Sequence, residues 1–260
     1  MVGPLHQNLA LHCDRDDARY ELAAALELHD DAYHVRVQEI VGSIAALDGT
    51  GLLRDVARAS FGEALGYVLH GVEDGPTRIG LVEGYYAYLG LGMVWLDTLE
   101  SGLIDAPSAL VASTWARTRP NASRLACAVT EGFLEAAVRT ITGWCAEVRE
   151  LRDAELGARC RYAVTLHGPA APTERAAGSG AHLRLLPTPA RVQLQSGVDG
   201  LIEIDGRWFA HVPAGLYAKA LAEWLALAAS SGAPLLALAL AQLDYVSAPA
   251  AAPLRLAPQT

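Results

Sequence analysis

The chain has few groups that could neutralise the phosphates of a nucleic acid. Lys219 is the only lysine, the arginines are dispersed, and the 260 residues carry a formal net charge of −9. Nucleic-acid surfaces need clustered lysines and arginines, because phosphate neutralisation supplies most of their affinity. The composition therefore argues against a nucleic-acid partner and favours small molecules or other proteins.

The sequence also lacks a secretion signal and a membrane span. Its first residues have neither a basic start nor a continuous apolar core of signal-peptide length. The most apolar stretch, 218–240, is interrupted by a glutamate, two serines, a glycine and a proline. We expect a cytoplasmic protein that does not cross a membrane.

Several common motifs are missing as well. The glycine-rich stretches do not join a strand to a helix, so neither a phosphate-binding loop nor a dinucleotide fingerprint is present. The four cysteines, at 13, 127, 145 and 160, contain no CxxC pair and are expected to be reduced thiols. No serine, histidine and aspartate set can be argued from spacing alone.

What is present is the composition of a packed protein, with 52% apolar and 19% charged residues. Apolar spacing predicts helices over 15–47, 51–71 with a bend or a restart near Ser60, 76–90, 123–142 ended by Gly143, and 213–229. Strands are predicted over 93–100, 109–118, 145–153, 160–167, 191–195 and 201–212, the last folding at Asp205-Gly206. This order predicts an α+β fold, with helices packed on one face of an antiparallel sheet.

Breaks in the pattern suggest the domain organisation. Residues 1–50 form an N-terminal helical segment, 51–167 a main domain, and 168–181 (GPAAPTERAAGSGA) a linker. Residues 182–246 are expected to form a smaller C-terminal α+β unit, and 247–260 a tail. The smaller unit is also open to interpretation as a partial second copy of the main domain.

The middle of the chain carries a recognisable arrangement of residues. Cys127 precedes the small-residue helix EGFLEAA, Glu150 follows 23 residues later, Gly157 lies in a turn, and Cys160 closes a hairpin. With the upstream LLRDVARASFGEALGYVLHG, this resembles the 4-vinyl reductase domain, a TRAPP-like domain found in the sensor halves of aromatic-responsive bacterial activators. The resemblance covers roughly 50–167 and implies a dimeric small-molecule sensor or carrier module with an apolar pocket.

The resemblance also implies a metal site at Cys127, Glu150, Asp153 and Cys160. All four are competent ligands for zinc or iron. Asp153 stands where the family has a cysteine, and the interval from Gly157 to Cys160 is one residue shorter than in the family. The alternative is that the two cysteines pack as small apolar side chains and the carboxylates are solvated.

An aromatic set is expected to line the pocket and to contact a small apolar or aromatic ligand. Its members are Phe61, Tyr67, Tyr85, Tyr88, Trp95, Trp115 and Phe133. The alternative is a filled core, because aromatic side chains at these spacings usually pack against one another.

The sequence does not decide whether the protein is an enzyme. Relatives of the resembling domain also occur among pigment-maturation proteins and ring hydrolases, so the alternative function is a biosynthetic-cluster enzyme, a hydrolase or reductase-associated protein that uses the cysteine and carboxylate residues. His29 and His34 are five residues apart, so on one helix they would not share a face.

Overall fold

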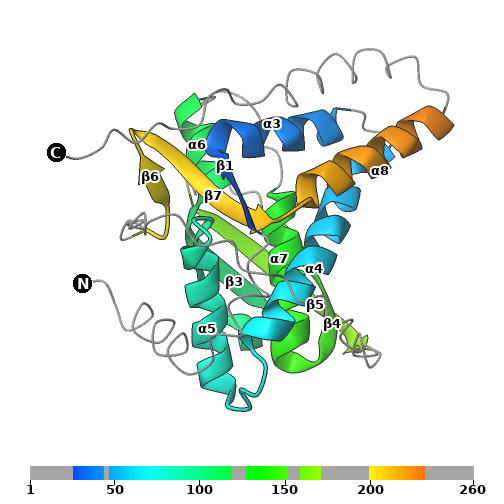
Figure 1. Ribbon diagram of the computed structural model, residues 1–260. Helices are drawn as coiled ribbons and strands as arrows, with labels where there is room; N and C mark the ends of the chain where they lie inside the picture. Colours follow the sequence, from blue (N-terminus) through cyan, green and yellow to red (C-terminus); the bar gives the residue numbers. More distant parts are fainter. Residues whose placement is uncertain (1–25, 44–46, 119–126, 152–158, 171–198, 232–260) are drawn as a thin grey trace, which may run out of the picture.

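The structure is a computed structural model that describes residues 26–43, 47–118, 127–151, 159–170 and 199–231 (Figure 1). Its strands are β1 (Leu26–Asp30), β2 (Gly92–Trp95), β3 (Leu103–Ala109), β4 (Trp144–Leu151), β5 (Cys160–Pro169), β6 (Ile202–Ile204) and β7 (Arg207–Pro213). Its helices are α3 (Asp31–Gly42), α4 (Gly49–Val68), α5 (Gly75–Tyr88), α6 (Leu110–Thr118), α7 (Ala128–Thr142) and α8 (Leu216–Ser230), with a 3-10 turn, η2 (Leu99–Ser101). The predicted α+β class is confirmed.

The larger sheet has the strand order β2-β3-β5-β4, with antiparallel neighbours. Helix α7 leads into its edge strand β4 through Gly143, which has a φ of 75° and ends the helix as predicted. Strands β4 and β5 confirm the predicted pair at 145–153 and 160–167 over the residues described. Gly157, in the predicted turn, lies outside the described residues.

The predicted strand at 109–118 is wrong, because this segment forms helix α6. The strand that pairs with β2 is β3, which ends at Ala109 and includes Pro107. The β2–β3 register shifts between Met93 and Trp95, and Pro107 lies at this irregular part, where its missing N–H is tolerated. The β-branched and aromatic residues of 110–118 suggest a strand, but burial against α3 decides for a helix.

The smaller sheet joins distant parts of the chain in the order β1-β7-β6. β1 pairs with β7 from Leu26 opposite Pro213 to Asp30 opposite Phe209, and Figure 1 draws the two strands side by side in blue and yellow. The helical prediction for 15–47 is therefore wrong for 26–30, because β1 ends where the Asp30 carboxylate accepts from the Tyr33 amide and starts α3. Residues 15–25 lie outside the described residues.

The turn at Asp205-Gly206 is confirmed between β6 and β7. Both residues have positive φ, 51° and 74°, as a tight hairpin turn requires. Helix α8 follows and confirms the predicted C-terminal helix. The predicted strand at 191–195 lies outside the described residues, as does most of the predicted linker.

The two sheets share one core. Across their junction, Gly92 donates its amide to the Gly200 carbonyl at 3.1 Å, and His211 donates to the Leu89 carbonyl at 2.7 Å. The buried apolar cluster runs without a break from α3 to α8. β1, from the predicted N-terminal segment, thus completes the sheet of the predicted C-terminal unit, while the exact domain boundaries stay predictions.

Helices α4 and α7 make the most extensive contact of any two helices in the described structure. α4 runs unbroken over Gly49–Val68, so it does not restart near Ser60. Its two apolar stripes face different neighbours, α7 on one side and α8 on another, so one continuous helix buries both. A Cβ on Gly132 of α7 would lie 2.4 Å from the Arg54 carbonyl oxygen, so only glycine allows this approach.

Over the described ranges, every helix is too short or too polar to traverse a bilayer.

Candidate metal centre

Three of the four predicted metal ligands meet inside the protein. One ligand atom each from Cys127, Glu150 and Cys160 lies within 4.8 Å of the other two, and all three side chains are buried. Asp153 lies outside the described residues, so its part in the site stays a prediction. We call Cys127, Glu150 and Cys160 the thiol–carboxylate cluster.

Strand register brings two members of the cluster together. Glu150 of β4 lies opposite Tyr162 of β5, and Cys160 lies two residues before Tyr162 on the same strand. Residues directly opposite and residues two apart point to the same face of a sheet. Glu150 and Cys160 therefore both point to the buried face.

Helix α7 supplies the third member. Cys127 immediately precedes the helix, and its backbone N–H donates to the Glu150 carboxylate at 3.0 Å. This bond satisfies one of the amides that a helix start leaves unpaired, and it fixes one oxygen of Glu150. The cysteine and the glutamate are thus held together before any metal is considered.

A second buried glutamate supports the cluster from the next turn of α7. The Glu131 carboxylate accepts from the Glu150 backbone N–H at 2.9 Å and lies 3.5 Å from a guanidinium nitrogen of Arg54. The net effect on the pKa of Glu131 is an increase, because burial raises it. The hydrogen bond from Glu150 and the neighbouring arginines lower it by less. Glu131 therefore fixes the backbone at Glu150.

Glu135, one turn further along α7, repeats the arrangement. Its carboxylate accepts from the Val148 N–H at 3.1 Å, from Arg58 at 3.1 Å and from Arg149 at 3.3 Å. Val148 and Glu150 belong to the edge strand β4, so α7 provides acceptors for two of its amides. Sequence reasoning missed both roles, although EGFLEAA shows the four-residue spacing of Glu131 and Glu135.

Two buried tyrosines lie beside the cluster and were also missed. Tyr86 of α5 and Tyr162 of β5 are both fully buried. Burial raises the pKa of each hydroxyl, and the nearby Cys127, Cys160 and Glu150 raise it further. The Tyr86 hydroxyl and the Thr130 hydroxyl are 3.0 Å apart. Both phenols are therefore part of the surroundings of the thiol–carboxylate cluster.

The donor chemistry of the cluster fits zinc. Two cysteine sulfurs and one glutamate oxygen are ordinary zinc ligands, and a buried site favours a neutralising cation over free anions. The hydrogen bond from the Cys127 backbone N–H orients the Glu150 carboxylate, as metal-binding carboxylates require. Iron accepts the same donor types, so the ligands alone do not separate the two metals.

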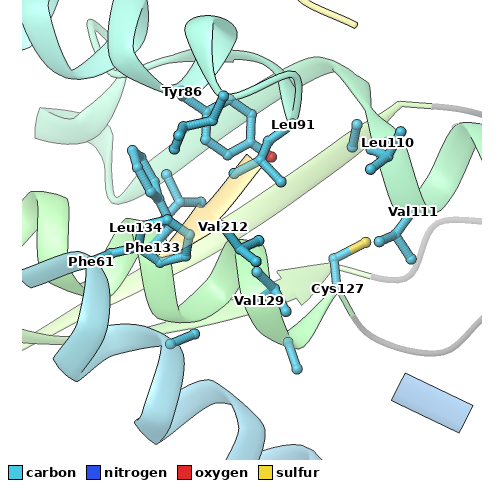
Figure 2. Close-up of a cluster of buried hydrophobic side chains, with 14 of the residues drawn as sticks. Phe61, Tyr86, Leu91, Leu110, Val111, Cys127, Val129, Phe133, Leu134 and Val212 are labelled. Carbon is cyan, nitrogen blue, oxygen red and sulfur yellow. The ribbon is translucent and has the colours of Figure 1, made fainter. Parts of the chain in front are cut away.

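The predicted aromatic set divides between core and surface. Phe61, Tyr85 and Phe133 are buried near one another, with ring centroids 5.1 Å apart for the two phenylalanines and 6.4 Å for Tyr85 and Phe133. Figure 2 shows Phe61 and Phe133 in the packed core. Trp115 is buried on α6.

The remaining members do not lie in that core. Tyr67, Tyr88 and Trp95 are about two-fifths exposed, at 38%, 39% and 44%. Tyr86 takes a place in the core that the prediction did not give it, with its ring 4.9 Å from that of Phe133. The structure therefore brings together only part of the predicted ligand-lining set.

A second buried polar cluster joins the two ends of the described chain. His34 Nδ1 of α3 lies 2.5 Å from the Tyr217 hydroxyl of α8, and the ring of His29 is 6.0 Å from that of His34. The two histidines approach each other because His29 lies on β1 and not on the helix. Burial, aided by His29, lowers the pKa of His34 to about 3.

His34 is expected to make the protein sensitive to acid. Its pKa is depressed in the folded state relative to the ordinary 6.5, so the unfolded chain binds the proton first and stability falls as the pH drops from about 6.5 toward 3. The slope is about 1.4 kcal/mol per pH unit. We expect His34 to lower the free energy of unfolding by about 2 kcal/mol between pH 7.5 and pH 5.

Urea unfolding at both pH values measures this effect. His34→Gln should flatten the pH dependence by that amount, while His70→Gln, at an exposed position after α4, should leave it unchanged. An unchanged slope in His34→Gln would show that the buried histidine does not carry the effect.

Comparison with known proteins gives no relative for this chain. No protein-family model matches it, and searches of curated proteins and of solved structures also return no match. The resemblance to the 4-vinyl reductase domain therefore depends on the residues of the sequence.

Proposed function

We propose that this protein is a small-molecule-binding module of the 4-vinyl reductase type, organised around a zinc ion held by Cys127, Glu150 and Cys160. The observation that carries the proposal is the approach of three chemically suitable, buried ligand atoms to within 4.8 Å of one another. Bound zinc would supply a positive charge that offsets the buried anions and links α7 to the β4–β5 hairpin.

Several contacts support a metal centre over ordinary packing. The Glu150 carboxylate is buried, and its backbone and one oxygen are both fixed by hydrogen bonds. A buried carboxylate is costly unless it is paired or bound to a metal. Two cysteines that only filled space would not need a buried carboxylate oxygen within 4.8 Å of their sulfurs.

The small-molecule part of the proposal depends on the apolar surroundings of the cluster. The core beside it contains Phe61, Tyr85 and Phe133, and a small apolar or aromatic compound is the class of ligand that such residues bind. A homodimer is the form that the resemblance implies. A catalytic role for the same cysteines and carboxylate is the alternative.

Elemental analysis tests the metal. Protein purified without added metal should contain about one zinc per chain, and Cys127→Ser and Cys160→Ser should each weaken zinc binding by about a hundredfold or more. Cys145→Ser is the matched control, because Cys145 is exposed on β4. A wild-type protein that neither contains zinc nor takes it up would contradict the proposal.

Native mass spectrometry and thermal unfolding test the small molecule. A ligand that binds the folded protein raises its unfolding temperature in proportion to the logarithm of its concentration. We expect at least one member of a panel of aromatic and acyl compounds to do so with the zinc-loaded protein. No shift with the whole panel, and no co-purifying compound, would leave a metal-binding protein without the sensor function.

A further inference from the structure

The Tyr162 hydroxyl is a buried polar group whose partner is missing from the described part of the protein. Tyr162 is fully buried, and within the described ranges its hydroxyl has no hydrogen-bond partner. A buried hydroxyl without a partner destabilises the folded protein. A bound molecule, water or ion is one explanation for such a group.

The position of this hydroxyl points to the thiol–carboxylate cluster. Tyr162 lies opposite Glu150 across the β4–β5 pair and two residues from Cys160, on the same buried face. Cys160, Cys127 and Glu150 all interact electrostatically with its hydroxyl. The unpartnered O–H is therefore in the same buried space as the three proposed ligands.

Tyr86 provides a contrast within the same space. Its hydroxyl also interacts with Cys127, Cys160 and Glu150, but it already has a hydrogen-bond partner in Thr130 at 3.0 Å. The two tyrosines thus differ in the one property that matters for binding, which is a free hydrogen-bonding hydroxyl. Tyr86 is therefore the matched control for Tyr162.

The ligand charges indicate what the hydroxyl holds. Two thiolates and one carboxylate around a divalent ion leave a net negative charge, so a further anion is disfavoured and a neutral oxygen donor is favoured. With Cys127, Glu150 and Cys160 filling three positions of a tetrahedral zinc ion, the fourth position takes such a donor in place of Asp153. A neutral tyrosine hydroxyl donates a hydrogen bond to that oxygen.

We propose that Tyr162 is a ligand-positioning residue, whose hydroxyl donates to a neutral oxygen ligand at the open position of the metal. The oxygen belongs to water in the resting protein and to the carbonyl group of a small neutral compound in the liganded protein. This inference rests on the proposed zinc centre and adds to it a fourth position and a ligand class.

Cobalt substitution tests the inference, because the visible spectrum of Co²⁺ reports both binding to thiolates and exchange of a ligand. Acetamide is the neutral carbonyl probe and acetate the anionic one. In the Co²⁺-loaded wild type, acetamide should change the spectrum and bind more tightly than acetate. Tyr162→Phe should weaken acetamide binding about tenfold and keep the Co²⁺ affinity within about threefold.

The matched control and the remaining outcomes separate the alternatives. Tyr86→Phe should leave acetamide binding within about twofold of wild type. Equal acetamide binding by wild type and Tyr162→Phe, or a wild-type spectrum that acetamide does not change, overturns the inference and leaves the metal centre standing.

Two further results also overturn the inference. A tenfold or greater loss of Co²⁺ affinity in Tyr162→Phe, with a phenolate-to-iron absorption band in the Fe³⁺-loaded wild type, would make Tyr162 a metal ligand instead. A wild type that binds no Co²⁺ would remove the proposed function and this inference together. Circular dichroism of each variant establishes that it is folded.

Discussion

Replacing Gly132 by alanine is expected to destabilise the protein by about 3 kcal/mol. The new Cβ would lie 2.4 Å from the Arg54 carbonyl oxygen, 2.7 Å from the Ala57 Cβ and 2.8 Å from the Arg58 backbone nitrogen. Two of these contacts are with backbone, so no side-chain rotation relieves them. Helices α4 and α7 would have to separate, which also pulls Arg54 and Arg58 away from the glutamates of α7.

The direction of the change in stability tests this prediction. Alanine in place of glycine normally stabilises a helix by about 1 kcal/mol. Gly66→Ala, on the exposed side of α4 with nothing within 4 Å of the added Cβ, should show that ordinary gain. Urea unfolding of both variants measures the difference, and a Gly132→Ala protein as stable as wild type would mean that the two helices are not this close.

Glu135→Ala should destabilise the protein by about 3 kcal/mol. The substitution removes the acceptor for the Val148 N–H and leaves Arg54, Arg58 and Arg149 without their shared carboxylate. The expected loss lies at the lower end for a broken buried ion pair, because Arg58 and Arg149 are more than two-fifths exposed and can turn toward water.

An exposed glutamate provides the comparison for Glu135. Glu63→Ala, on the exposed surface of α4, should change the free energy of unfolding by no more than about 0.5 kcal/mol. Denaturant unfolding followed by circular dichroism measures both variants. A loss below 1 kcal/mol for Glu135→Ala would mean that the arginines and the β4 amide find water or other acceptors without cost.

Elements with strong local signals were predictable. Gly143 ends α7 because glycine adopts the left-handed conformation easily, and Pro76 lies in the first turn of α5, where its missing N–H has no cost. Asp205 and Gly206 form the predicted turn for the same conformational reason. These residues act through their own backbone, so their effect can be read from a few positions.

Elements decided by distant partners were not predictable. The sequence LELHD of β1 shows only a short alternation, and it becomes a strand because β7 provides a hydrogen-bonding edge about 180 residues later. In α6, residues with strand propensity form a helix that places Thr114 and Arg117 on the buried Asp31 carboxylate of α3. The local sequence of β1 does not contain β7, and that of α6 does not contain Asp31, so neither partner can be seen in the local pattern.

Some residues of the candidate site could be predicted from the sequence and others could not. The resemblance singled out Cys127, Glu150 and Cys160, and the structure brings their ligand atoms together. It did not indicate Tyr162 or Glu131, whose importance comes from what their side chains face. An unpartnered hydroxyl and a carboxylate bound to a strand amide can be recognised only when the surrounding atoms are placed.

The sequence by itself determined the α+β class, the helix ending at Gly143, the hairpin turn and the types of residue available to bind a metal. These follow from backbone conformations, apolar spacing and side-chain chemistry, which act over a few residues. Only the tertiary structure decided that β1 completes the sheet of β6 and β7, that α4 and α7 touch at Gly132, and that two thiols and a carboxylate share one buried space. Those outcomes depend on packing and strand register between segments far apart in the chain, where each contact is fixed by the fold as a whole.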